Sequence, residues 1–161
     1  MVKPFNVLFE ENNSPIIQYQ GKTIHRFCNI ENSGSFTLKF SNIKRASKNF
    51  QAILILFNDC KGKMFIGGQE KELPKGIFPK LLFWEDLSPN SFEISFILES
   101  GNIIICNGSD PLGTKERCHY LTKNCAMFIE ECAENKLKFF CNDHEYDDDF
   151  DDLIFDMEII K

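Results

Sequence analysis

The sequence of 161 residues has few of the side chains on which nucleophilic and acid–base catalysis commonly depend. It holds three histidines, three tyrosines and one tryptophan, against 17 phenylalanines. The histidines show no arrangement typical of a catalytic triad, although a triad is recognised by geometry and not by chain order. We therefore expect a non-catalytic protein. A hydrolase that uses paired carboxylates is the enzymatic alternative.

Long apolar stretches are also missing. No window approaches the ~18–20 apolar residues that a membrane helix needs, so we expect no membrane span. The segment Met1–Asn6 leads into a strand-like stretch without the apolar core of a signal peptide. These absences predict a cytoplasmic protein, or one exported without a classical signal peptide.

Paired cysteine motifs are absent, although the chain has seven cysteines. An odd number without a signal peptide favours reduced thiols, and cysteines inside apolar runs behave as small core residues. Zinc is one alternative, because the last four cysteines are regularly spaced and two histidines lie nearby: Cys118, Cys125, Cys132, Cys141, His119 and His144. Structural zinc sites usually contain a Cys-x-x-Cys pair, which this chain lacks.

Positive charge is in short supply. The chain has 18 Lys and Arg against 24 Asp and Glu, and its formal net charge is −6. Binding of nucleic acid requires a basic surface that neutralises phosphates, so we expect no nucleic-acid partner.

Short segments of alternating or continuous apolar residues are abundant. Phe36, Leu38 and Phe40 alternate with polar residues, as in a half-buried strand. Ala52–Phe57 is apolar throughout, as in a strand buried on both faces. Similar segments recur between turn signals along the chain. They predict an all-β fold, an antiparallel β-sandwich of jelly-roll or Greek-key type with little helix, in one domain over residues 1–161.

Four local predictions depend on weaker signals. We expect a strand at Phe5–Phe9 and a strand or helical turn at Cys125–Glu131. The segment Asn107–Thr114 is rich in turn residues and predicts a loop that opens with a tight Asn-Gly turn. Trp84 is expected in the core because of its large apolar area, although a sugar-stacking platform is the functional alternative.

The most unusual stretch is acidic and lies between two strand-like segments, Leu137–Cys141 and Leu153–Ile160. Crowded carboxylates repel one another unless they extend into water or share a cation. Ca²⁺ takes 6–8 oxygen ligands, and residues two apart share a face of an extended chain. The sequence therefore predicts a calcium site, for which the candidate ligands are Asp143, Glu145, Asp147, Asp149, Asp151 and Asp152.

One aromatic residue separates this stretch from an ordinary solvated acidic run, which is the alternative interpretation. Phe150 lies between Asp149 and Asp151, so in an extended backbone it points away from them. We expect Phe150 to anchor the loop in the core while the acids converge outside.

The pattern Asp147-x-Asp149-Phe150-x-Asp152, followed by a Leu-Ile-Phe strand, resembles the acidic loop of the calcium-dependent bacterial fucose- and mannose-binding lectins. It is also similar to the Asp-x-Asp-aromatic-Asn/Asp-Asp signature of several bacterial calcium-associated β-sandwich domains. In the lectins an acidic residue four positions before the first Asp binds metal, and Asp143 holds that position. The lectins have Asn after the aromatic residue and a terminal glycine that completes a neighbouring subunit's site. Here those positions are Asp151 and Lys161.

The resemblance covers only this C-terminal segment and implies Ca²⁺ as the ion and carbohydrate as a ligand. Asn107 and Asp110 are further candidates for ligand binding if their segment lies beside the acidic loop at one end of the sandwich. We expect a glycan or protein partner near the loop, and a homo-oligomer. The alternative to a lectin-like module is a structural, self-assembling protein that calcium stabilises.

Overall fold

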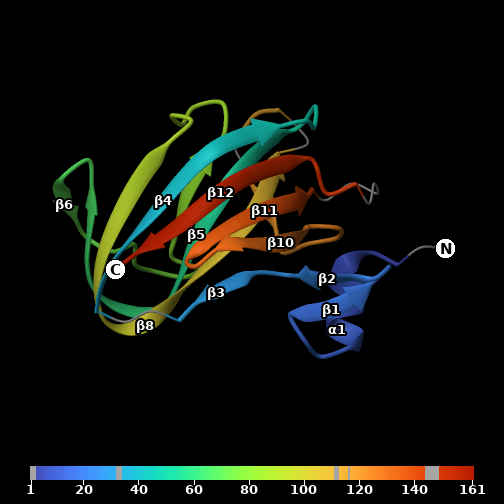
Figure 1. Cartoon of the computed structure of the whole chain (residues 1–161), viewed down its shortest axis with the longest axis horizontal. Coiled ribbons are helices and arrows are strands. Elements are labelled where there is room, and N and C mark those ends of the chain that lie inside the picture. Colours follow the sequence, from blue (N-terminus) through green and yellow to red (C-terminus); the bar gives the residue numbers. More distant parts are fainter. Residues whose placement is uncertain (1–2, 32–33, 111–112, 116, 144–148) are drawn as a thin grey trace.

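Antiparallel strands make up nearly all of the fold (Figure 1). The computed structural model describes residues 3–31, 34–110, 113–115, 117–143 and 149–161. Within them lie one helix and twelve strands: α1 (Phe5–Glu11), β1 (Ile16–Tyr19), β2 (Lys22–His25), β3 (Cys28–Ile30), β4 (Gly34–Arg45), β5 (Phe50–Ile66), β6 (Gln69–Lys71), β7 (Lys80–Trp84), β8 (Phe92–Asp110), β9 (His119–Tyr120), β10 (Ala126–Ala133), β11 (Lys136–Asn142) and β12 (Leu153–Ile160). The predicted all-β antiparallel fold is confirmed.

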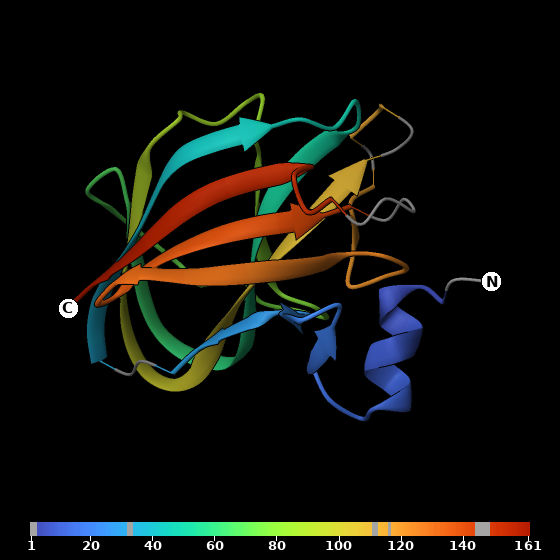
Figure 2. The same ribbon diagram turned by 45° about the vertical axis from the view of Figure 1, so that its right-hand side comes forward.

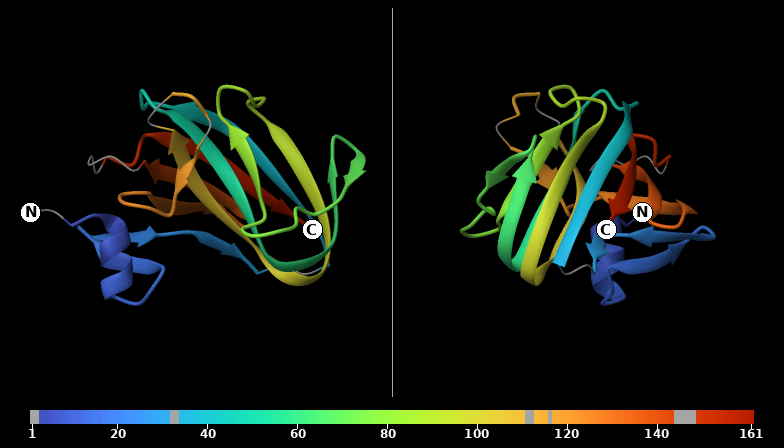
Figure 3. Two further views of the ribbon diagram at one scale, coloured as in Figure 1. Left: turned by 180° about the vertical axis from the view of Figure 1, so that it is seen from behind. Right: turned by 60° about the vertical axis from the view of Figure 1, so that its left-hand side comes forward.

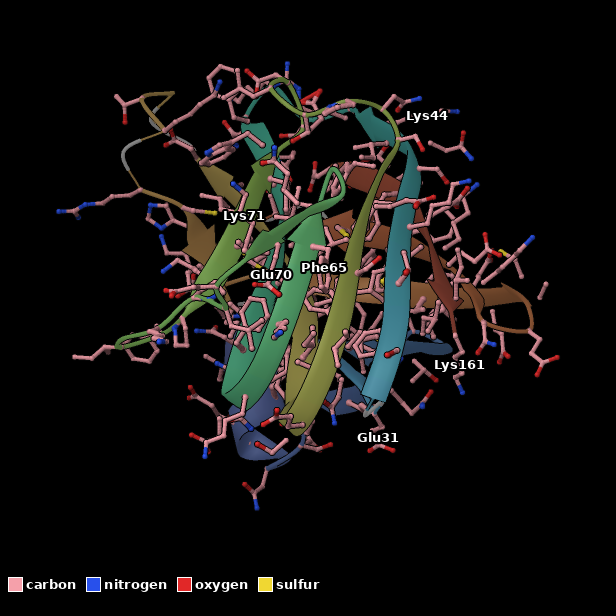
Figure 4. The ribbon with its side chains drawn as sticks, turned by 90° about the vertical axis from the view of Figure 1, so that its left-hand side faces the viewer. Glu31, Lys44, Phe65, Glu70, Lys71 and Lys161 are labelled. Carbon is pink, nitrogen blue, oxygen red and sulfur yellow. The ribbon has the colours of Figure 1, made fainter. Side chains whose placement is uncertain are left out.

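The strands form one sheet that folds over into two layers. The order of the main path is β1-β2-β10-β11-β12-β4-β8-β5-β6, and β3, β7 and β9 pair outside it. The first half of β8 pairs with β4, and its second half pairs with the first half of β5. Figure 4 faces the layer in which β4, β8 and β5 lie side by side, with Lys44 near one end of β4 and Glu31 and Lys161 near the other.

The fold-over depends on a bend that β5 and β8 share. Figure 3 shows the two long strands curling together, and their register shifts between Asn58 and Gly62. Gly101 has φ +87, and a Cβ there would lie 2.5 Å from the carbonyl oxygen of Asp59. Gly62 has φ +144, and a Cβ there would collide with the carbonyl oxygen of Ile97. Because only glycine avoids both the contact and the strained φ, these two residues allow the backbones of β5 and β8 to approach closely at the bend.

The main core lies between the layers and is rich in aromatic rings. Phe36, Leu38 and Phe40 all point into it, so the predicted alternation of β4 is confirmed. Phe155 and Phe139 stack with ring centroids 4.6 Å apart. Burial of such rings supplies the apolar area that stabilises the sandwich. Trp84 is 8% exposed and belongs to this core, as predicted.

The predicted strand at Phe5–Phe9 is wrong, because these residues lie in α1. The helix packs in a second apolar cluster. The apolar residues Phe5, Leu8 and Phe9 have the i, i+3, i+4 spacing of a helix face, whereas Phe5, Val7 and Phe9 also fit the alternation of a short strand. Phe5 and Phe9 are buried against residues of β1, β2 and β10. Figure 2 shows α1 beside the β1–β2 hairpin, at the end of the sheet where β12 begins.

Two other local predictions are now decided. The uncertain segment after Cys125 is a strand, β10. The predicted tight turn at Asn107-Gly108 is wrong, because both residues lie within β8, where Asn107 pairs with Ile53 and Gly108 with Ala52. In the part of the chain that the structure describes, no helix is long and apolar enough to span a membrane.

Candidate metal centre

Three carboxylates meet just before β12. One oxygen from each of Asp149, Asp151 and Asp152 lies within 4.8 Å of the others. Two oxygens that bind one Ca²⁺ at ~2.4 Å are at most about 4.8 Å apart, so this spacing suits a shared ion. Asp149 and Asp151 are exposed, whereas Asp152 is 4% exposed. The three side chains can therefore hold one metal ion at the protein surface, with Asp152 as the inner ligand.

Asp152 is held in place by hydrogen bonds of its backbone N–H, its backbone carbonyl and its side chain. Its N–H donates to the carbonyl oxygen of Cys141 at 3.1 Å, and its carbonyl accepts from the Ala46 N–H at 3.3 Å. Its side-chain Oδ2 accepts a 2.8 Å bond from the backbone N–H of Asp143. These bonds join the start of β12 to the end of β11 and to the segment after β4, so this carboxylate is preorganised.

The Asp143 side chain is buried and points to the start of β5. Its Oδ2 accepts hydrogen bonds from Ser47 Oγ at 3.0 Å, Asn49 Nδ2 at 3.3 Å and Gln51 Nε2 at 3.3 Å. Asp143 is 1% exposed. It touches the site through its backbone bond to Asp152, and it lies outside the group of three carboxylates.

Every fully or nearly fully buried polar residue of the described chain lies at this same end of the sandwich. They occupy the start of β5, the end of β8, the turn before β10, and the facing ends of β11 and β12: Asn49, Gln51, Asn107, Ser109, Asp110, Asn124, Asn142, Asp143 and Asp152. We call this set the polar end. Because burying a polar group is costly without partners, these side chains depend on the hydrogen bonds that they form with one another and with the backbone.

Asn107 links the two layers within the polar end. Its Nδ2 donates a 2.8 Å hydrogen bond to the carbonyl oxygen of Asn142, the last residue of β11. Asn142 Nδ2 in turn donates to the carbonyl oxygen of Asn124 at 3.3 Å. The structure thus brings Asn107 next to the acidic segment, as its ligand-binding prediction required, although from inside a strand and not from a loop.

Asp110 ends β8 and organises the chain that follows. Its carboxylate accepts a hydrogen bond from the backbone N–H of Lys115, and its charge contributes to raising the pKa of the Cys118 thiol. The role of Asp110 in ligand binding stays a prediction.

Phe150 anchors the acidic loop, as predicted, but in the second apolar cluster. It is 4% exposed, and its ring centroid lies 5.6 Å from that of Phe5 in α1. Its φ of +54 is unusual for a bulky residue and turns the chain so that the ring enters the cluster. The flanking Asp149 and Asp151 stay at the surface as a result.

The charges of the site affect one another. A hydrogen bond from Asp151 to Asp149 raises the pKa of Asp151 above its ordinary value, with smaller contributions from desolvation and from the negative charge of Asp149. A cation bound among the carboxylates would favour the ionised form and reverse this effect.

Sequence reasoning missed the buried residues behind the carboxylates. Gln51 precedes an otherwise apolar run and is completely buried, and its position was the only available signal. Its partner Asp143 lies far away in sequence, so their contact required the fold. Two other predicted ligands, Glu145 and Asp147, lie outside the described residues.

The zinc alternative finds no support in the described residues, because the three aspartates form the one group there with metal-ligand spacing. The cysteines are free, and burial raises the pKa of both Cys118 and Cys125 to about 12. Burial therefore keeps these thiols protonated in the metal-free chain. Comparisons of the chain with protein-family models, curated proteins and solved structures gave no match.

Proposed function

We propose that this chain is a non-catalytic calcium-binding β-sandwich module whose ion is held by Asp149, Asp151 and Asp152. The observation that carries the proposal is the convergence of three carboxylate oxygens within 4.8 Å at an end of the sandwich that is backed by buried polar residues. Hard oxygen ligands and a negative local charge suit Ca²⁺ better than a soft transition metal.

The remaining coordination positions lie toward solvent. Two of the three aspartates are exposed, so an ion at this site would keep water ligands. Vicinal hydroxyl groups of a sugar can replace such waters and bind the ion directly. Together with the lectin-like pattern of the loop, this supports carbohydrate as the ligand class. A calcium-stabilised structural protein is the alternative if calcium binds but glycans do not.

A thermal melt in Ca²⁺, in Mg²⁺ and in EDTA tests the metal. An ion that binds only the native state adds about 2.7 kcal/mol to the free energy of unfolding at a hundredfold excess over its Kd. We expect a higher Tm in Ca²⁺ than in EDTA, with a smaller effect of Mg²⁺ because it demands a tighter octahedral site.

The variant D149N/D151N should lose the calcium-dependent part of the Tm, since it removes two of three ionised ligands. Glu134→Gln is the matched control, because Glu134 is an exposed acid in the turn at the opposite end of β10 and β11. An equal Tm in Ca²⁺ and EDTA for the wild-type protein would refute the proposal. A glycan array screened in Ca²⁺ and in EDTA then tests carbohydrate binding.

A further inference from the structure

A largely apolar hollow of about 870 Å³ opens beside the bend, between β5, β8, the segment 74–79 and the residues after β9. Leu56 and Ile104, partners across β5 and β8, line it together with Pro79, Tyr120 and Leu121. Leu56 is five residues along β5 from Gln51 of the polar end, which is about 17 Å in an extended strand. The hollow is therefore separate from the candidate metal centre.

The two most exposed large apolar side chains of the described chain border this hollow. Ile77 is 88% exposed and Phe78 is 75% exposed, and Phe78 also lines the hollow. Phe78 has φ +56, a conformation that is rare for an aromatic residue. The segment is fixed at its end by a 3.1 Å hydrogen bond from the Phe57 N–H to the carbonyl oxygen of Pro79. We call Ile77 and Phe78 the apolar tip.

Adjacent exposed apolar residues beside an apolar hollow are typical of an interaction surface. The charges on this surface complement each other as well. Asp59 and Lys75 both line the hollow and both are exposed. Neither forms a salt bridge with any residue that the structure describes. The surface thus carries a tip and a hollow, and a negative and a positive group, so it matches a copy of itself.

We propose that two copies of this chain associate through this surface, with the apolar tip of each copy in the hollow of the other and Lys75 of each near Asp59 of the other. Because tip and hollow are neighbours on one surface, a twofold axis satisfies both at once and the contact closes as a dimer. A tip and a hollow on distant surfaces would instead give an open chain of copies. The dimer requires no ion at the acidic loop.

Sedimentation velocity over a range of protein concentrations tests the dimer, in Ca²⁺ and in EDTA. We expect the wild-type protein to dimerise in both buffers. The double variant I77D/F78D should be monomeric throughout, because two aspartates cannot enter an apolar hollow. Both side chains are exposed in the single copy, so the melting curve of the variant should match that of the wild type at protein concentrations below the dimer Kd, where both are monomeric. Leu87→Asp is the control, since Leu87 is 71% exposed outside this surface and its variant should remain dimeric.

A double-mutant cycle tests the arrangement of the charges. D59N and K75Q each remove one partner of the pair, and Asn suits the φ of +51 at residue 59. Each should raise the dimer Kd by up to about thirtyfold, because a twofold dimer contains the contact twice and each contact contributes up to about fivefold. The double variant D59N/K75Q should be no weaker than either single variant, because the same contact is lost. A monomeric wild type, a dimeric I77D/F78D variant, or independent effects of the two charges would overturn the proposal.

Discussion

The apolar core and the polar end of this sandwich are equally buried but are stabilised in different ways. Phe155 and Gln51 are both 0% exposed. Phe155 packs against other rings, and apolar contacts of this kind need no particular partner. Gln51 Nε2 has two acceptors, whereas its Oε1 has no hydrogen-bond partner among the described residues, and neither has Asn142 Oδ1.

This difference separates the residues that stabilise the fold from those that surround the candidate metal centre. A buried polar group without a partner costs roughly 1–3 kcal/mol, so an apolar residue would stabilise these positions better. The polar residues are concentrated at the end that holds the three carboxylates. Of the six buried side-chain atoms that have no hydrogen-bond partner among the described residues, three belong to the polar end, on Gln51, Asn124 and Asn142.

The largest effect is expected in the apolar core. Phe155→Ala removes a ring that stacks on Phe139 and lies 6.0 Å from the ring of Phe40. The free energy of unfolding should fall by about 3–5 kcal/mol, because a cavity remains after the ring is lost. Urea denaturation measures this loss. The calcium-dependent shift of the Tm should persist in the variant, and its disappearance would show that the two regions are not independent.

An intermediate effect is expected in the polar end. Asp143→Asn replaces an oxygen that accepts from Ser47, Asn49 and Gln51 with an amide that presents its own donor. The loss of a charged acceptor should lower the free energy of unfolding by roughly 1–3 kcal/mol. The calcium affinity should also fall, because the side-chain bonds of Asp143 hold in place the backbone N–H that binds the Asp152 carboxylate.

Ser47→Ala is the matched control for Asp143→Asn, since it keeps the charge and removes one donor to the same oxygen, together with the acceptor of the Asn49 N–H. It should cost about 1 kcal/mol and leave the calcium affinity nearly unchanged. If Asp143→Asn were as stable as the wild type in urea and bound Ca²⁺ equally well, the polar end would have no supporting role for the site.

The same contrast explains which features the sequence could predict. Apolar alternation places residues correctly when one face packs and the other does not, as in Phe36, Leu38 and Phe40. It failed for Phe5–Phe9, because a run this short fits both the strand and the helix period. The turn signal at Asn107-Gly108 was also misleading, because such a signal is only local, whereas the partner of Asn107 lies on β11.

The candidate site was predictable only in part, because sequence signals are local. Asp149, Asp151 and Asp152 are close in sequence, so their convergence depends on a short segment and on the anchor Phe150. The residues behind them come from strands distant in sequence. No local pattern could connect Gln51 with Asp143.

The smallest effect concerns the charge of the exposed carboxylates. The pKa of Asp151 is raised in the folded chain relative to its ordinary value of 3.8. Above pH 3.8 the folded state therefore holds more protons than the unfolded state, so stability from this group falls as the pH rises through the folded pKa. In EDTA the contribution of Asp151 to the free energy of unfolding should therefore be smaller at pH 7 than at pH 4.

Titration of Asp151 by carbon-13 NMR in EDTA measures this directly. The variant D149N removes the neighbouring carboxylate and should bring the pKa of Asp151 down toward 3.8, because the charge and the charged hydrogen-bond acceptor are lost together. Glu134→Gln should leave the titration of Asp151 unchanged. Saturating Ca²⁺ should also lower the pKa of Asp151 in the wild-type protein, since a bound cation favours the ionised carboxylate. An Asp151 pKa that responded to D149N but not to Ca²⁺ would mean that the two acids interact without sharing an ion.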